Sequence, residues 1–187
     1  MPEKEISDLV VGAFLHDVGK IGIPDNILLK PGKLTADEFE VMKTHPLLGI
    51  EIVADNPWLG GAALTIRYHH EYFDGTGYPD GLRGDTIPLA ARIFAVVDVF
   101  DALTSERPYK KPMALAQALT IIERDSGRHF DPEVVVIFKE IAPVLYATAL
   151  QAGNAGLRQE MQAVLSRYFR TAAAPAGATS HPGESVD

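Results

Sequence analysis

The most apolar segment of the chain begins at Pro88 and constrains the fold more than any other stretch. Leu89, Ile93, Val96, Phe100 and Leu103 recur with helical spacing, and Phe94 and Val97 widen the stripe they form. A helix with so wide an apolar face is expected to be buried on most of its sides. No strand-like alternation persists elsewhere in the sequence, so the predicted fold class is all-α.

Asp98 stands in the interior of this apolar segment, between Val97 and Val99. An unpaired carboxylate there would be costly, so it must be protonated, paired with a cation or bound to a metal ion. Arg67 and Arg92 are the candidate ion-pair partners. A structural salt bridge and a metal site are therefore both open readings of Asp98.

Histidines and a second aspartate lie at the ends of other predicted helices. His69 and His70 are adjacent, and neighbours on a helix diverge by about 100°, so they cannot share one ion as an i, i+4 pair does. They could instead reach two ions lying ~3.5–4 Å apart. His16-Asp17 and His45 occupy similar helix ends. The alternative for the His69-His70 pair is one structural and one solvated histidine, and for His16-Asp17 it is a polar helix terminus. Since the chain has no cysteine, any metal must be held by nitrogen and oxygen.

The remaining pattern predicts helices joined by one long loop. A capping box at Thr35 and Glu38 indicates a helix start, and residues 71–87 form a loop of the length that usually has a function. Residues 23–34 are expected to be ordered but non-helical, and a kink or break is expected at Pro143. The predicted helices span residues 5–18, 36–44, 46–55, 60–70, a segment from 88, 113–125, a segment from 132, and 157–170.

Composition limits the function classes. The length of 187 residues fits one domain, and a net charge of −8 with a pI of about 5.2 argues against binding a nucleic acid polymer. The sequence has no apolar run long enough for a membrane span and no signal-peptide pattern at its start, so a cytoplasmic location is expected. An anionic substrate would need local cations or metal ions.

The chain resembles the HD-GYP subfamily of HD-domain metal-dependent phosphohydrolases over roughly residues 5–140. The resemblance rests on many motifs in one order, which makes chance agreement improbable. These motifs are His16-Asp17 with Gly19-Lys20, Lys43-Thr44-His45-Pro46, His69-His70-Glu71, Asp74-Gly75, Gly77-Tyr78-Pro79, Ala91-Arg92-Ile93, Asp98–Ser105, Arg107-Pro108-Tyr109 and His129–Pro132.

The resemblance implies a compact helical HD-domain bundle that hydrolyses cyclic di-GMP to linear pGpG, and in some members to GMP. It implies two divalent ions, iron or manganese. Asp17 and Lys20 would be catalytic, and Lys20, Arg107 and Lys110 would contact the substrate phosphates. The loop at Gly77, Tyr78 and Pro79 would either dock diguanylate cyclase (GGDEF) domains or shape the pocket mouth. The implied metal ligands are His16, Asp17, His45, His69, His70 and Asp98.

Several residues near these motifs are expected to have plainer roles. We expect His129 to pack or form hydrogen bonds, Asp101 either to support the metal site or to form a cap or ion pair, and His181 to be inert. The predicted organisation is a phosphohydrolase domain over residues 1–150, a helix over 151–171 and a disordered tail over 172–187.

One feature implied by the family is missing from this sequence. Members carry another metal-ligand histidine on an upstream helix, and none of the fifteen residues before His16 is a histidine. We therefore expect one ion to bind firmly and a second loosely, with low phosphodiesterase activity. The uncovered apolar groove is expected to favour either self-association, for example as a homodimer, or partial disorder at the N-terminus. Two functional classes stay open: a phosphodiesterase (or a nucleotidase on another phosphoester), and a catalytically weak module that binds the nucleotide or a partner.

Overall fold

The structure is a computed structural model that describes residues 1–106 and 111–169, without the side chains of residues 153–155. The regular elements of the described part are all helices, joined by loops, and its only β-pairing is an isolated bridge between Ser126 and Phe130. This confirms the all-α prediction. The elements are α1 (Glu3–Leu15), η1 (Val18–Gly22), α2 (Asp25–Leu28), α3 (Ala36–Met42), α4 (His45–Val53), η2 (Pro57–Leu59), α5 (Ala62–Tyr68), η3 (Gly84–Thr86), α6 (Leu89–Thr104), α7 (Leu115–Arg124) and α8 (Pro132–Tyr168).

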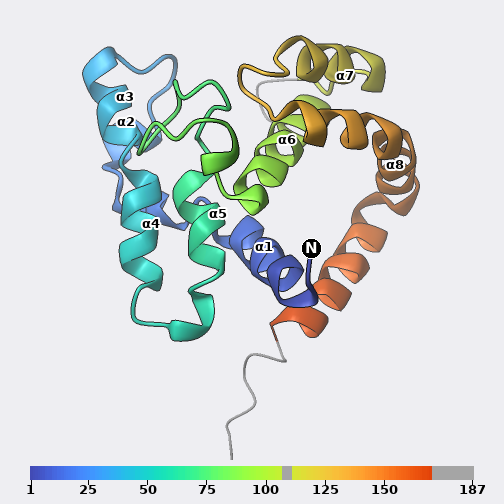
Figure 1. The fold of residues 1–187 in the computed structure, drawn as a ribbon, viewed down its shortest axis with the longest axis horizontal. Coiled ribbons are helices and arrows are strands. Elements are labelled where there is room, and N and C mark those ends of the chain that lie inside the picture. The colour runs from blue at the N-terminus through green and yellow to red at the C-terminus, as the bar shows by residue number, and fades with distance from the viewer. Residues whose placement is uncertain (107–110, 170–187) are drawn as a thin grey trace, which may run out of the picture.

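Helix α6 lies at the centre of the fold (Figure 1). It packs against α1 and α5 and also against α7 and α8, so it joins the two ends of the chain. Phe94 and Val96 are buried as predicted, whereas Leu89 and Val97, both expected on the buried face, are each 42% exposed. The helix is therefore covered on two sides and open along the strip that carries Val97.

Two separate apolar cores lie on either side of α6. The first joins α1, α4, η2 and α5, and the second joins α6, α7, the turn after α7 and α8. The first contains Val11, Val53, Leu59, Ala62 and Ile66; the second contains Val96, Ile122, Phe130, Val135, Phe138 and Ala142.

Backbone contact without intervening side chains joins η1 to α4. A Cβ atom added at Gly19 would lie 1.9 Å from the carbonyl oxygen of His45 and 2.4 Å from the amide nitrogen of Gly49. Neither backbone could yield to such a contact, so a glycine is required at residue 19. This close approach brings the end of α1 beside the start of α4.

The long loop after α5 is fixed by a buried carboxylate. Glu71 is 2% exposed and accepts hydrogen bonds from the backbone amides of Asp80 (2.8 Å) and Leu82 (3.0 Å). Gly77 packs directly on the backbone of residues 70–72, where an added Cβ would meet the amide nitrogen of Tyr72 at 2.2 Å. The loop is thus folded back over the end of α5.

Some sequence-based expectations differ from the structure. Residues 25–28 form a short helix inside the segment expected to be non-helical. Helix α8 continues through Pro143 and past residue 150, so the expected break is absent and the predicted boundary at 150 falls inside a helix. The capping box at Thr35 and Glu38 is confirmed. The predicted tail over 172–187, with His181, lies outside the described residues, as do Arg107 and Lys110.

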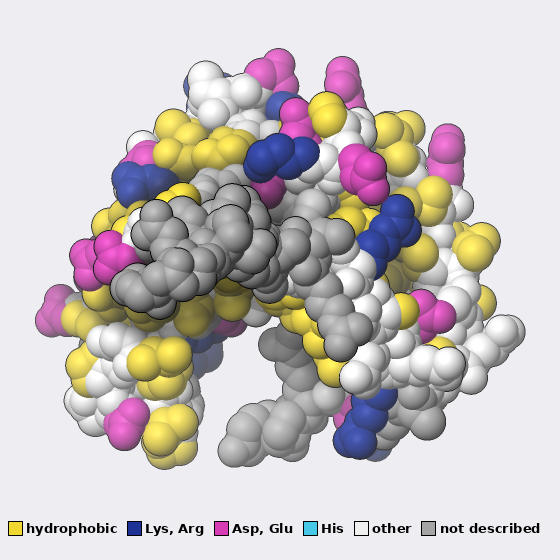
Figure 2. All heavy atoms as spheres, turned by 90° about the horizontal axis from the view of Figure 1, so that it is seen from below, with side chains coloured by type: hydrophobic (Ala, Val, Ile, Leu, Met, Phe, Trp, Pro, Cys, Tyr) yellow, Lys and Arg dark blue, Asp and Glu magenta, His cyan; other side chains and the backbone are white. Residues whose placement is uncertain are grey.

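The surface carries many apolar side chains. On α8, Val136, Ile137 and Val144 are 61–69% exposed. On the face shown in Figure 2, hydrophobic side chains are interspersed with acidic and basic ones. Within the described residues, no helix has both the length and the hydropathy that crossing a membrane would require.

Candidate metal centre

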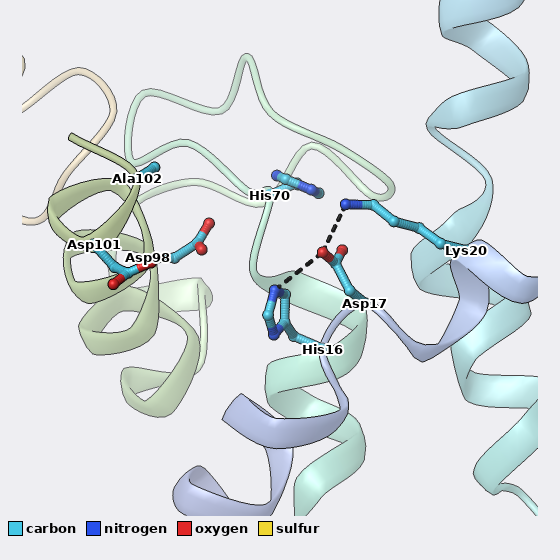
Figure 3. Close-up of a pocket in the computed structure, with 7 residues that line it drawn as sticks. All are labelled: His16, Asp17, Lys20, His70, Asp98, Asp101 and Ala102. Carbon is cyan, nitrogen blue, oxygen red and sulfur yellow. Dashed lines mark hydrogen bonds and ion pairs between the residues drawn. The ribbon is translucent and has the colours of Figure 1, made fainter. Parts of the chain in front are cut away.

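The predicted ligand residues lie where four helices meet. His16 follows the last residue of α1, His45 is the first residue of α4, and His69 follows the last residue of α5. Asp17 lies at the start of η1, while Asp98 comes from the middle of α6 (Figure 3). Helix ends suit this role because the chain turns away there and leaves the side chain facing the junction.

Three of the histidine rings are held by the same local contact. The Nδ1 atoms of His16, His45 and His69 lie 2.8, 2.8 and 2.9 Å from the carbonyl oxygens of Ala13, Met42 and Ile66, each three residues earlier. A carbonyl oxygen only accepts, so each Nδ1 must carry the proton and donate it. The ring orientation is thereby fixed and Nε2 is directed away from the helix, as in histidines that bind metals.

The Nε2 atoms of His45 and His69 lie 3.3 Å apart. With Nδ1 protonated and the ring neutral, both Nε2 atoms present a lone pair, and two lone pairs at this distance repel each other. A cation between them removes the repulsion. Asp17 Oδ1 lies 3.4 Å from the Nε2 atom of His45 and 4.0 Å from that of His69 and adds negative charge to the same space. The residues present therefore fit a divalent ion.

His70 completes a group of three histidines. One ligand atom from each of His45, His69 and His70 lies within 4.8 Å of the others. The ring of His70 stacks on that of Tyr78, with centroids 4.8 Å apart and an interplanar angle of 28°, and the Tyr78 amide donates to the His70 carbonyl oxygen at 3.1 Å. The loop that carries Tyr78 thus holds His70 in place.

Asp17 is stabilised as an anion by its neighbours in the site. Burial alone would raise the pKa of Asp17, but hydrogen bonds from His16 (3.3 Å) and Lys20 (2.6 Å) and their charges outweigh it, so the pKa lies well below its usual value. Lys20 reaches back three residues because η1 is a 3₁₀ turn. The carboxylate is therefore ionised throughout the physiological range.

The buried histidines are neutral and suited to bind a cation. Burial, followed by the charges of His16 and His45, lowers the pKa of His69 to about 4. Burial also lowers the pKa of His45 and that of His70, for which the charges of His69 and His45 add to the effect. For His16 burial is outweighed by Asp17, the Ala13 carbonyl and Asp98, which together raise its pKa.

Asp98 faces the histidines across a cavity of about 280 Å³. Figure 3 shows its carboxylate on α6 directed toward the space that His16, Asp17, Lys20 and His70 line from the other side. The arginines considered as its partners are held by other carboxylates: Arg67 binds both oxygens of Asp80 (2.9 and 3.0 Å), and Arg92 bonds Asp131 and Asp85, each at 2.7 Å. Both arginines are thus bound by other carboxylates, and Asp98 lines the cavity together with the other candidate ligands.

The structure thus brings all six predicted ligand residues and Lys20 together. His129 lies elsewhere, between Tyr72 and Phe130, with ring centroids at 3.9 and 4.2 Å, in keeping with the packing role expected of it. Asp101 lines the same cavity as Asp98. Sequence reasoning missed the anchoring role of Glu71, whose only signal was a carboxylate directly before a glycine-rich loop.

Comparisons with known proteins agree with this geometry. A family model described as HD domain matches residues 1–134. The chain belongs to the HD domain family. The match spans the described segments that carry the six candidate ligands.

Curated relatives of this HD domain include phosphodiesterases of cyclic dinucleotides. The cyclic di-GMP phosphodiesterase response regulator RpfG of Xanthomonas campestris is 52% identical over 137 residues, which cover 72% of this chain and 36% of the relative. The 3'3'-cGAMP-specific phosphodiesterase 2 of Vibrio cholerae is 42% identical over 142 residues, covering 75% of this chain and 27% of the relative. The HD domain chain therefore spans about a third of the length of these relatives.

A solved structure shares the fold. The crystal structure of a cyclic GMP-AMP specific phosphodiesterase of V. cholerae superimposes with a TM-score of 0.65 at 22% identity, over 84% of this chain and 43% of the other. At this identity the likeness establishes the helical arrangement of the HD domain and nothing finer.

Proposed function

We propose that this HD domain is a metal-dependent phosphodiesterase that hydrolyses cyclic di-GMP to linear pGpG, with further cleavage to GMP as the open alternative. The observation that carries the proposal is the pair of neutral histidines, His45 and His69, whose Nε2 atoms face each other beside the ionised Asp17. A chain that only packed these rings would have no reason to leave two acceptors opposed at 3.3 Å. The names of the curated relatives supply the substrate class.

The site would hold two divalent ions, iron or manganese, on His16, Asp17, His45, His69, His70 and Asp98. When bound, such ions lower the pKa of water and neutralise charge on a phosphoryl group. The chain itself fixes three of the imidazoles through backbone carbonyls and keeps Asp17 ionised. Imidazole nitrogen and carboxylate oxygen suit both of these metals.

Besides its bond to Asp17, Lys20 would contact a phosphate group of the substrate. Its Nζ atom lies at the cavity, 2.6 Å from Asp17, and 38% of the side chain is exposed. An ammonium group there can meet a phosphoryl oxygen and offset the charge that develops on it. In a chain of net charge −8, such local cations are needed, and we propose the same role for Arg107 and Lys110.

Hydrolysis of 3'3'-cGAMP is a second candidate, because relatives specific for that nucleotide are 37–42% identical to this chain. A binding module without activity is less well supported, since such a module has no need for a cavity lined by histidines and carboxylates. Docking of GGDEF domains at Gly77, Tyr78 and Pro79, homodimer formation and a cytoplasmic location remain predictions.

The proposal is tested by incubating the manganese- or iron-loaded protein with cyclic di-GMP and with 3'3'-cGAMP and separating the products. We expect linear pGpG from cyclic di-GMP. The variants Asp98→Ala and His69→Ala should lose bound metal and hydrolysis together, whereas His129→Ala, a histidine away from the cavity, should keep its metal. Hydrolysis of neither nucleotide, or full metal content in Asp98→Ala, would show that the assignment is wrong.

A further inference from the structure

Helix α3 carries an exposed aromatic ring beside the candidate metal centre. Phe39 is 46% exposed, and no residue of α3 is buried. The helix is held instead by its capping box and by Lys30, whose Nζ atom bonds both oxygens of Glu38 at 2.6 and 2.8 Å. Nearly half of the Phe39 side chain is therefore accessible to solvent at the edge of the candidate metal centre.

The ring is the outer end of an aromatic series that starts at the metal-facing histidines. Tyr78 stacks on His70 with centroids 4.8 Å apart, and Phe39 meets Tyr78 edge-on at 6.4 Å and 84°. Burial, followed by the charges of Tyr72 and Asp17, raises the pKa of Tyr78, so its phenol group stays protonated. Phe39 is thus separated from the candidate ligand His70 by a single ring.

A cation accompanies the two outer rings. Lys43 Nζ lies 5.7 Å from the centroid of Phe39 and 6.0 Å from that of Tyr78, and it also contacts Glu40 at 2.6 Å. An ammonium group held over aromatic faces and partly neutralised by a carboxylate presents hydrogen-bond donors without a large net charge. Purine bases have both the flat face and the ring acceptors that such a surface would meet.

We propose that Phe39, Tyr78 and Lys43 form a subsite for a purine base of the nucleotide whose phosphate is held at the histidine cluster. Phe39 would stack on the base and Lys43 would donate to its acceptors. The inference rests on the proposed function for the position of the phosphate, and it adds a determinant of base recognition outside the cavity that the candidate ligands line.

The test compares two ligands that differ by a base. Binding of GMP and of ribose 5-phosphate to the manganese-loaded full chain is measured by calorimetry for the wild type, Phe39→Ala and Phe39→Trp. Base stacking implies that Phe39→Ala weakens GMP by about fivefold or more and that Phe39→Trp restores it. Ribose 5-phosphate, which lacks the base, should bind all three proteins within about twofold.

Phe14→Ala is the matched control, because Phe14 is 45% exposed and packs on Phe169 instead. It should leave the preference for GMP unchanged. The subsite is overturned if Phe39→Ala weakens both ligands equally, or neither, or if the wild type does not prefer GMP. These binding measurements are independent of activity. If the wild type hydrolyses no cyclic dinucleotide but Phe39→Ala selectively weakens GMP binding, the proposed function is refuted and the base subsite is supported.

Discussion

The two cores on either side of α6 are built by different means. In the core of α1, α4 and α5, the elements approach so closely that an added Cβ would lie less than 3.0 Å from backbone atoms at Gly19 and from side-chain atoms of α5 at Gly12 and Gly49. In the core of α6, α7 and α8, large side chains such as Phe130 and Phe138 fill the space, and a Cβ at Gly127 would meet nothing closer than 3.9 Å. Asp98 belongs to a helix of the second core, α6. The candidate ligands at the ends of elements that build the first core are His16, Asp17, His45 and His69.

This difference bears on how the site keeps its geometry. Imidazoles held by backbone carbonyls and packed backbones cannot shift without moving a helix. A side-chain core can relax around a smaller residue, at a cost that depends on the cavity left behind. We therefore expect the histidine half of the site to be disrupted by an added methyl group and the α6 half to tolerate loss of several carbons.

The largest effect is expected for Gly19→Ala. Its methyl group would lie 1.9 Å from the His45 carbonyl oxygen and 2.4 Å from the Gly49 amide nitrogen. Since both of these are backbone atoms, η1 must separate from α4. We expect loss of metal binding, measured by metal analysis after dialysis, and a lower melting temperature. Gly22→Ala is the control in the same turn, because its methyl group would meet only a Leu48 side-chain carbon at 3.0 Å. Equal metal content in the two variants would contradict the backbone-contact explanation.

A smaller effect, confined to stability, is expected for Ile122→Ala in the other core. Ile122 is fully buried beside Val96 and Phe130, so its truncation should lower the free energy of unfolding by about 2–5 kcal/mol. Ile122→Val should cost about 0.5–1.5 kcal/mol. Denaturant unfolding measures both, and metal affinity well below the melting temperature should match the wild type. Weaker metal binding in Ile122→Ala would show that α6 transmits strain to Asp98.

A third effect concerns the loop that holds His70. Glu71→Gln keeps the shape of the side chain but turns one acceptor toward the Asp80 or Leu82 amide into a donor, at a cost of about 1–3 kcal/mol. Amide hydrogen exchange at residues 80 and 82 should become faster, and the Tyr78 ring should stack less firmly on His70. Glu140→Gln, an exposed change on α8, should leave both observables unaltered. Unchanged exchange in Glu71→Gln would mean that other contacts fix the loop.

The sequence predicts the helices and the candidate ligand residues better than it predicts the contacts that hold these residues in place. The stripe from Leu89 to Leu103 and the capping box at Thr35 act within one element, so they can be read from spacing alone. The burial of Glu71 and the approach of Gly19 to α4 depend on how separate elements meet. The carbonyl contacts of His45 and His69 are local, but they depend on the ring orientation, which residue spacing does not give. Of the kink or break expected at Pro143 from its missing amide, the break does not occur, since α8 runs as one helix of 37 residues.

The smallest expected effect is a pH dependence at His129, on the side-chain-packed half of the molecule. Burial lowers the pKa of His129 from 6.5 to about 4, although Asp125 and Asp74 act in the opposite direction and Arg128 assists. The unfolded chain therefore binds a proton before the folded chain does. The stability that the neutral ring contributes is fully present above about pH 6.5 and is lost as the pH falls toward 4.

His129→Phe keeps a ring between Tyr72 and Phe130 but cannot titrate. Between about pH 7.5 and about pH 5.8, the free energy of unfolding should fall by about 1 kcal/mol more in the wild type than in His129→Phe. The buried histidines of the metal centre titrate in both proteins and cancel in this difference, so parallel pH profiles would show that His129 is not the group that titrates.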